Sequence, residues 1–217
     1  FNASGPFAGK GAFSTLRVMA SLYPEPVQVL VRSDGPKQLE QLRGKRINLG
    51  LPGSASRETA LAVLAAHQLQ PEDFAEVTSL NLQEALAALR DDDIDGLIQI
   101  IGLPADAIRA ASEDMDIRLL PLRPDAGEQL LKNRPGTLPL TIAARSYAQQ
   151  TQAVPTLAVS SLLLSDSSLA SKEVEMLVRL IFEPQLGWLQ LGSIQGAQIS
   201  PKHALHSFGL PLHDGVT

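Results

Sequence analysis

The residues best suited by type and spacing to bind a ligand form the turn Gly53-Ser54-Ala55-Ser56. The preceding residues 47–51 are typical of a buried strand, and the following residues of an amphipathic helix. A strand that ends in such a turn directs free backbone N–H groups and the positive helix end at one point, which suits a carboxylate or phosphate. The same pattern also caps helices that bind nothing, so both interpretations stay open.

Other chemistries have less support in the sequence. The four histidines, His67, His203, His206 and His213, show no metal-ligand spacing with carboxylates, and no metal site is expected. The chain has no cysteine, which excludes disulfides, thiol catalysis and cysteine-based zinc sites. Residues 91–96 resemble the start of a calcium loop, but Gly102 stands where that loop needs its closing glutamate. We therefore expect a binding protein with no catalytic residues and no cofactor.

Composition narrows the class of protein. A hydrophobic content of 44% with 19% charged residues is typical of a soluble globular protein. The net charge of −5, without a run of Lys or Arg, argues against a nucleic-acid partner. No apolar run approaches the roughly 18–20 residues that span a bilayer. A chain of 217 residues can form one large domain or two small lobes.

Strands and helices alternate in the first part of the chain. Strands are expected at residues 27–32, 47–51, 77–80, 94–101 and 117–120, and helices near Leu39, after Ser54 (with Leu61, Leu64 and Ala65 on the inward face), after Asn81 and after Pro104. This order predicts a mainly parallel sheet covered on both faces. Ligands of such sheets bind at the carboxyl ends of the strands, where Gly53 and Gly102 lie.

The chain changes character after Pro121. Prolines punctuate a region that is expected to be a connection, up to Pro139. A buried strand follows at residues 156–164, then a helix at 171–182 with Val174, Leu177, Val178 and Ile181 on its inward face, and a short helix at 200–203. This block has too few strands for a sheet of its own. We expect it to need a preceding N-terminal segment or a dimer partner.

Several phrases, in this order and spacing, resemble one family. They are residues 16–27, 42–46, 50–54, 89–90 with 94–96, Gly102 with Pro104, 154–159 and 209–213. Together they are similar to the TAXI-type (TRAP-associated extracytoplasmic immunogenic) solute-binding proteins of TRAP transporters. The resemblance implies an α/β, type II periplasmic-binding-protein-like fold with a ligand cleft between two lobes. It implies a second lobe at 33–138 and a first lobe, with hinge strands, made of 1–32 and 139–217. That first lobe is expected to be incomplete, because the family pattern begins upstream of Phe1.

The resemblance also implies a function. The protein is expected to be periplasmic, either free or membrane-anchored in its full-length form. It would capture a small organic acid or amino acid, glutamate-like or a dicarboxylate, and deliver it to the membrane subunits of a TRAP transporter. The alternative is a ligand-sensing or protein-interaction module with the same fold.

The ligand-binding residues that the resemblance implies are Asn2, Ser4, Tyr23, Gly53, Ser54, Ala55, Ser56, Gln99, Gly102 and Tyr147. Tyr23 lies where the chain crosses between lobes, and hinge packing is its alternative role. Gln99 and Gly102 either face the cleft or are buried within one lobe. Tyr147 either lies near the cleft or packs on the surface. Asn2 and Ser4 either reach the ligand or fray at the terminus.

Overall fold

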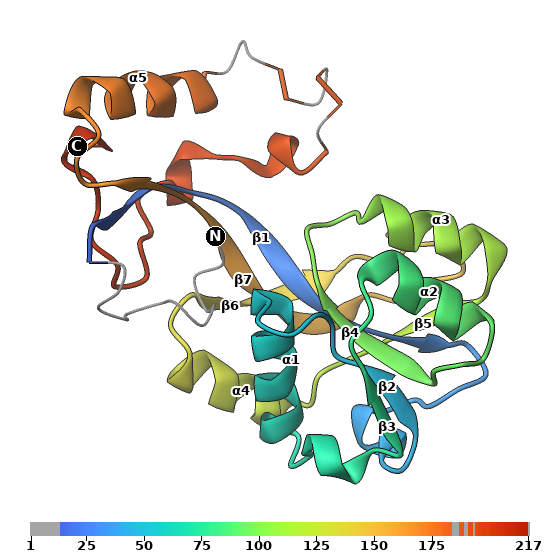
Figure 1. The fold of residues 1–217 in the computed structure, drawn as a ribbon. Coiled ribbons are helices and arrows are strands. Elements are labelled where there is room, and N and C mark those ends of the chain that lie inside the picture. The colour runs from blue at the N-terminus through green and yellow to red at the C-terminus, as the bar shows by residue number, and fades with distance from the viewer. Residues whose placement is uncertain (1–13, 184–186, 189–190, 193, 217) are drawn as a thin grey trace.

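The computed structural model describes residues 14–183, 187–188, 191–192 and 194–216. It has a larger lobe with a central sheet and a smaller lobe, which are joined by two long strands (Figure 1). These strands are β1 (Leu16–Arg32) and β7 (Val154–Asp166), which pair antiparallel. The predicted α/β class and the presence of two lobes are confirmed.

The larger lobe is a sheet between two helical layers. Its strands are β2 (Arg46–Asn48), β3 (Glu76–Thr78), β4 (Gly96–Ile100), β5 (Ile117–Leu120) and the end of β1. Helices α1 (Ala55–Ala66) and α4 (Pro124–Asn133) share one core cluster, and α2 (Leu82–Arg90) and α3 (Asp106–Asp114) share another. Burying apolar side chains on both faces of the sheet fixes the strand ends, and the loops that follow them, in place.

The sheet is mixed, so the prediction of a mainly parallel sheet was wrong. Among the named strands of the described residues, the parallel pairs are β2 with β3 and β2 with β4, and the other strand pairs are antiparallel. The end of β1 lies between β4 and β5 and runs antiparallel to both. Hydrophobic patterning cannot reveal this, because Val29, Leu30 and Val31 are buried whichever way the strand points.

Two elements were missed in the region expected to be a connection. The first is α4, where Pro124 occupies the first helical turn, a position at which proline costs no hydrogen bond. The second is β6 (Thr137–Ile142), which pairs with β7 and contains Pro139. Because β6 ends the row of strands, this proline breaks no internal ladder. Pro124 therefore marks the N-terminus of a helix, and Pro139 marks an edge strand of the sheet.

The smaller lobe is built from the outer halves of β1 and β7, helix α5 (Ser171–Ile181) and short 3-10 turns near the end of the chain. Its small core centres on Val18 and Leu162. The predicted inward face of α5 is confirmed at three of its four positions, because Val174 is buried and Val178 and Ile181 are half-buried. The fourth, Leu177, is 39% exposed. The short helix predicted near residue 200 is confirmed as a 3-10 turn at Pro201–His203 with Ser200 as its cap.

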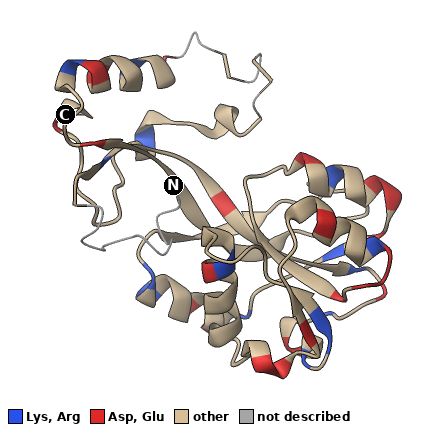
Figure 2. Cartoon of the chain, in the orientation of Figure 1, with Lys and Arg blue, Asp and Glu red and all other residues tan. Residues whose placement is uncertain are grey.

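The inward face of α1 also differs from its prediction. Ala60, Val63 and Leu64 are buried, but Leu61 is only half-buried and Ala65 is exposed. The lobe boundaries at residues 33–138 stay a prediction, and Leu157 of β7 packs into the core cluster of the larger lobe. Acidic and basic residues are interspersed along the elements of this lobe (Figure 2).

Candidate functional site

The turn before α1 has the geometry of a capped helix start. The hydroxyl of Ser54 accepts a hydrogen bond from Arg57 N at 3.1 Å and donates one to Leu51 O at 2.7 Å. Gly53 has φ of +74°, a left-handed conformation that glycine adopts without strain. Gly53 is exposed, and Ser54, Ala55 and Ser56 are half-buried. The turn is therefore open to solvent, and the Ser54 hydroxyl is committed to the cap.

Ser56 and Gln99 meet where α1 begins and β4 ends. Ser56 Oγ donates to Ile100 O at 3.2 Å. Gln99 Nε2 donates to the same carbonyl at 3.2 Å and to Ser56 Oγ at 3.4 Å. The structure thus brings these two predicted site residues together, because the carboxyl ends of neighbouring parallel strands lie at one edge of a sheet.

Gly102 and Tyr23 form a second predicted pair, with a partner that the sequence did not indicate. A Cβ on Gly102 would lie 3.3 Å from Tyr23 Cε2 and 2.9 Å from Gln195 Cγ. Gln195 comes from the smaller lobe, and its Nε2 donates to Pro104 O at 2.7 Å. Gln195 lies in an irregular segment without a motif, so no sequence signal identified it.

The loop after β2 is held in place by polar contacts. The guanidinium of Arg57 donates to Gly50 O at 2.9 Å and to Ser79 Oγ at 3.1 Å. Asn48 is buried, and its Oδ1 accepts from Leu80 N at 2.8 Å. These bonds join the carboxyl ends of β2 and β3 to the first turn of α1. Arg57 therefore positions the turn that carries the candidate anion site.

Tyr147 is buried, with 3% of its surface exposed. Its hydroxyl donates to Gln28 Oε1 at 2.6 Å and accepts from Ala105 N at 3.4 Å, and Gln28 Nε2 donates to Ile101 O at 3.2 Å. Burial raises the pKa of Tyr147 and outweighs the opposing effect of these hydrogen bonds. The hydroxyl thus supports the loop after β4.

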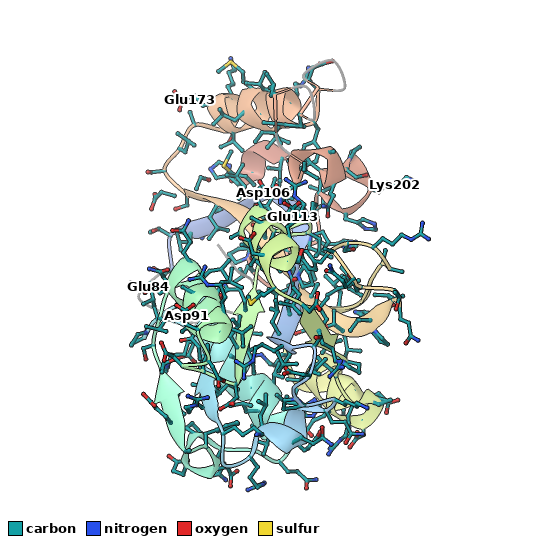
Figure 3. The ribbon with its side chains drawn as sticks, turned by 90° about the vertical axis from the view of Figure 1, so that its right-hand side faces the viewer. Glu84, Asp91, Asp106, Glu113, Glu173 and Lys202 are labelled. Atoms are coloured by element: carbon teal, nitrogen blue, oxygen red, sulfur yellow. The ribbon has the colours of Figure 1, made fainter. Side chains whose placement is uncertain are left out.

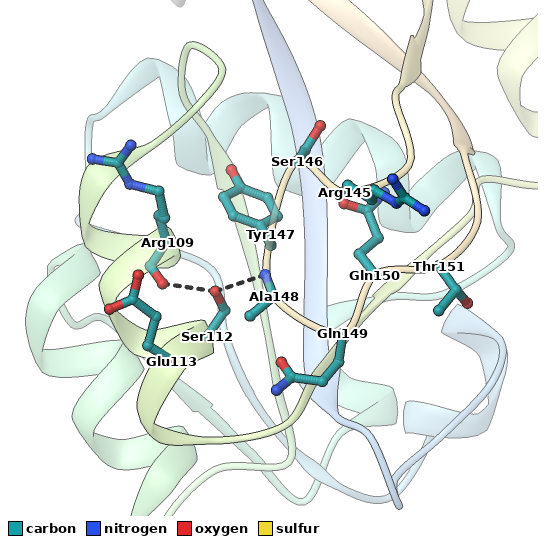
Figure 4. A pocket seen from close by; sticks show the side chains of 10 residues that line it. All are labelled: Arg109, Ser112, Glu113, Arg145, Ser146, Tyr147, Ala148, Gln149, Gln150 and Thr151. Carbon is teal, nitrogen blue, oxygen red and sulfur yellow. Dashed lines mark hydrogen bonds between the residues drawn. The ribbon is translucent and has the colours of Figure 1, made fainter.

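The ring of Tyr147 lines a pocket of about 520 Å³ between α3 and residues 145–151 (Figure 4). In this pocket Ser112 Oγ donates to Arg109 O at 2.6 Å and accepts from Ala148 N at 3.1 Å, which ties the segment to the helix. None of the other predicted ligand-binding residues that the structure describes lines this pocket. Asn2 and Ser4 lie outside the described residues.

A cluster of three ionisable side chains lies at the opposite end of α1, with His67 buried and Glu40 and Arg123 half-buried. His67 Nδ1 is 2.7 Å from Glu40 Oε1, which also accepts from Arg123 Nη1 at 3.1 Å. Burial alone would raise the pKa of Glu40, but the hydrogen bond to His67 and the charges of His67 and Arg123 outweigh it and lower that pKa. The cluster joins α1 to the start of α4, so its role is structural.

Two findings concern the described residues as a set. They contain no group of three or more histidine or carboxylate side chains that could hold a metal ion. Among the helices they form, none is both long and apolar enough to cross a bilayer.

The fold is thus that of an α/β protein with two lobes joined by long strands. Its candidate site lies at the strand ends that face the smaller lobe. The model of the NMT1-like family matches residues 1–217, and the chain belongs to this family. The TAXI type stays a prediction.

Solved structures similar to the chain include periplasmic binding proteins. One is the periplasmic aliphatic sulphonate binding protein SsuA from Escherichia coli, at 23% identity over 68% of this chain and 42% of that chain, with a TM-score of 0.43. Another is the alkanesulfonate-binding protein SsuA from Xanthomonas axonopodis pv. citri bound to MOPS, at 19% identity over 88% and 62%, with a TM-score of 0.45. A third is a TctC solute binding protein from Polaromonas, at 12% identity over 85% and 58%, with a TM-score of 0.46. The chain thus spans 42–62% of the length of these proteins.

Proposed function

We propose that the chain is the ligand-binding part of a periplasmic solute-binding protein that captures a small organic acid or amino acid and delivers it to a TRAP-type membrane transporter. The protein binds its ligand and does not transform it. One observation carries the proposal: the end of β4 meets the start of α1 at Gln99 and Ser56, and three residues further along the chain Gly102 meets Tyr23 of the long strand and Gln195 of the smaller lobe.

The start of α1 supplies the anion-binding chemistry in this proposal. The first N–H groups of the helix, at Ala55 and Ser56, have no hydrogen-bond partner in the described part of the chain, as is usual for a helix start. The helix dipole adds positive potential there. A ligand carboxylate would accept from these N–H groups and from the hydroxyl of Ser56, which now donates to Ile100 O.

The rest of the site suits the uncharged part of the ligand. Gln99 carries an amide group, and Tyr23 offers the edge of its ring beside Gly102. Amides bind hydroxyl, amino or amide groups in either direction, because each carries two donors and an acceptor. The proposed ligand is therefore a small mono- or dicarboxylate, glutamate-like in the simplest case, with its anionic end at the start of α1.

Titration calorimetry on the full-length protein tests this proposal with L-glutamate, succinate, lactate and ethanesulfonate. The Ser56→Ala variant loses one charge-assisted hydrogen bond, which costs about 1.5–3 kcal/mol and lowers affinity roughly tenfold or more. The matched control is Ser200→Ala, because this variant also removes the hydroxyl of a half-buried serine but in the smaller lobe.

Two results would contradict the proposal. No saturable binding of any of the four acids would exclude the ligand class. Equal affinity of the parent and the Ser56→Ala variant would exclude the start of α1 from the site.

A further inference from the structure

A segment near the end of the chain spans the two lobes. We call residues 194–199 the tail strap. Gln195 Nε2 donates to Pro104 O at 2.7 Å, and Gln198 Nε2 donates to Leu103 O at 2.5 Å. The two carbonyls are consecutive and belong to the loop that joins β4 to α3 in the larger lobe. Two side chains of one segment thus bind one short stretch of the other lobe.

The same loop is also held from within the larger lobe. Gln28 donates to Ile101 O, and the hydroxyl of Tyr147 accepts from Ala105 N. The first of these two contacts precedes Leu103 and Pro104 in the chain, and the second follows them. The loop is therefore anchored at both ends by its own lobe and held in the middle by the tail strap.

The contact lies beside residues of the candidate site. Gly102 is buried between the ring of Tyr23 and the side chain of Gln195, with no room for a methyl group. Gly102 also follows β4, whose end carries Gln99. A movement of the tail strap away from the larger lobe would thus uncover Gly102 and release the loop that borders the site.

We propose that the tail strap is the closing contact between the lobes, and that Gln195 and Gln198 are positioning residues for the candidate site. They hold the loop after β4 in the arrangement that completes the site beside Tyr23. Because a closed arrangement favours both the strap contact and a bound ligand, each stabilises the other. The coupling to ligand rests on the proposed function, whereas the strap contact itself does not.

Distance measurements between the lobes test the strap contact without ligand. The chain has no cysteine, so cysteines introduced at two exposed positions, Glu113 on α3 and Glu173 on α5, can each carry one spin label (Figure 3). Pulsed EPR on the full chain then gives the distribution of distances between the lobes. We expect a narrow distribution in the labelled parent. The variant with both Gln195→Ala and Gln198→Ala should give a broader distribution that extends to longer distances.

Two further variants make this result specific. The matched control carries Gln83→Ala and Gln129→Ala, two exposed glutamines of the larger lobe, and should keep the distribution of the parent. The isosteric Gln195→Glu replaces the donating amide by a carboxylate that repels Pro104 O, and should also broaden the distribution. An unchanged distribution in the double alanine variant, or in Gln195→Glu, would overturn the proposal.

A second arm tests the coupling with L-glutamate and ethanesulfonate as probes. A bound probe should narrow the distribution of the parent, and its affinity should fall about tenfold in the double alanine variant. Binding of equal affinity to both proteins would overturn the coupling and leave the proposed function intact. Broadening in the variant, without binding of either probe to the parent, would support the strap contact and count against the proposed ligand class.

Discussion

Replacing Gly102 by alanine tests whether the two lobes meet as described. The new Cβ would lie 2.9 Å from Gln195 Cγ and 3.3 Å from Tyr23 Cε2. The first distance is shorter than carbon atoms tolerate, and Cγ is not the free end of the side chain. Gln195 must therefore rotate about its first side-chain bond, which moves its amide away from Pro104 O. The backbone of Gly102 is not left-handed, so alanine adds no backbone strain at this position.

The magnitude follows from three contributions. A lost hydrogen bond costs about 0.5–1.5 kcal/mol, and a side chain forced off its preferred rotamer costs a further 0.5–1.5 kcal/mol or so. Alanine stabilises the protein by about 0.4–1 kcal/mol by restricting the unfolded chain. The expected net loss in the free energy of unfolding is about 1 kcal/mol. This loss cannot be much larger, because the tail strap can move away from Gly102 and so relieve the steric overlap.

Urea denaturation of the full chain measures this change. The matched control is Gly127→Ala in α4, where a Cβ would have no neighbour within 4 Å. That variant should be more stable than the parent by up to about 1 kcal/mol, since glycine disfavours a helix. In a Gln195→Ala background, which lacks Cγ, the substitution of Gly102 should cost clearly less. If Gly102→Ala proves as stabilising as Gly127→Ala, the contact between Gly102 and Gln195 does not exist in solution.

Two further predictions concern the supports of the site. Since the pKa of Glu40 is lowered in the folded state, its contact with His67 stabilises the protein above the ordinary carboxyl pKa of 4.5 and is lost as the pH falls below it. Glu40→Gln should therefore reduce the acid sensitivity of the unfolding free energy, measured by urea denaturation from neutral pH down to about pH 3, a range that extends below the ordinary carboxyl pKa. Tyr147→Phe leaves the buried Oε1 of Gln28 without its donor, so it should lower the unfolding free energy by about 1–3 kcal/mol at neutral pH.

Each of these predictions has a matched control. Glu128→Gln removes an exposed carboxylate that makes no ion pair among the described residues, and should keep the acid sensitivity of the parent. Tyr23→Phe removes a hydroxyl without a hydrogen bond in the described structure, and should leave stability unchanged at neutral pH. An acid profile of Glu40→Gln identical to that of the parent would contradict the first prediction. Equal stability of the two phenylalanine variants would contradict the second.

Local patterns predicted many of the elements but not the direction of the strands. The turn at Gly53 and the helix after it follow from residue types over a few positions, and strand β5 has the predicted bounds. Strand β1 continues from the predicted residues 27–32 back to Leu16 and runs against its neighbours. The direction of a strand depends on which distant segments it meets, and the hydrophobic period of two carries no such information.

Helix α5 shows how far periodicity alone can be trusted. Its apolar residues have helical spacing, and the helix exists with nearly the predicted bounds. The smaller lobe, as far as it is described, covers Val174 fully but Val178 and Ile181 only in part. Gly215 lies so close to the helix that a Cβ on it would be 2.8 Å from Val174 Cβ. Spacing predicts that a helix has an apolar face, but only the packed neighbours decide how much of that face is buried.

The residues of the candidate site also differ in whether local sequence patterns predict them. Ser56, Gln99 and Gly102 were predictable because each follows or ends a strand at one edge of the sheet, so a parallel pair is enough to bring them together. Gln195 was not, because its position depends on how the smaller lobe lies against the larger one. Its amide and that of Gln198 bind backbone carbonyls, which every loop offers, so no residue type in the loop marks the contact. A contact of this kind can be found only from the coordinates. In our proposal it is the contact that decides whether the site is open or closed.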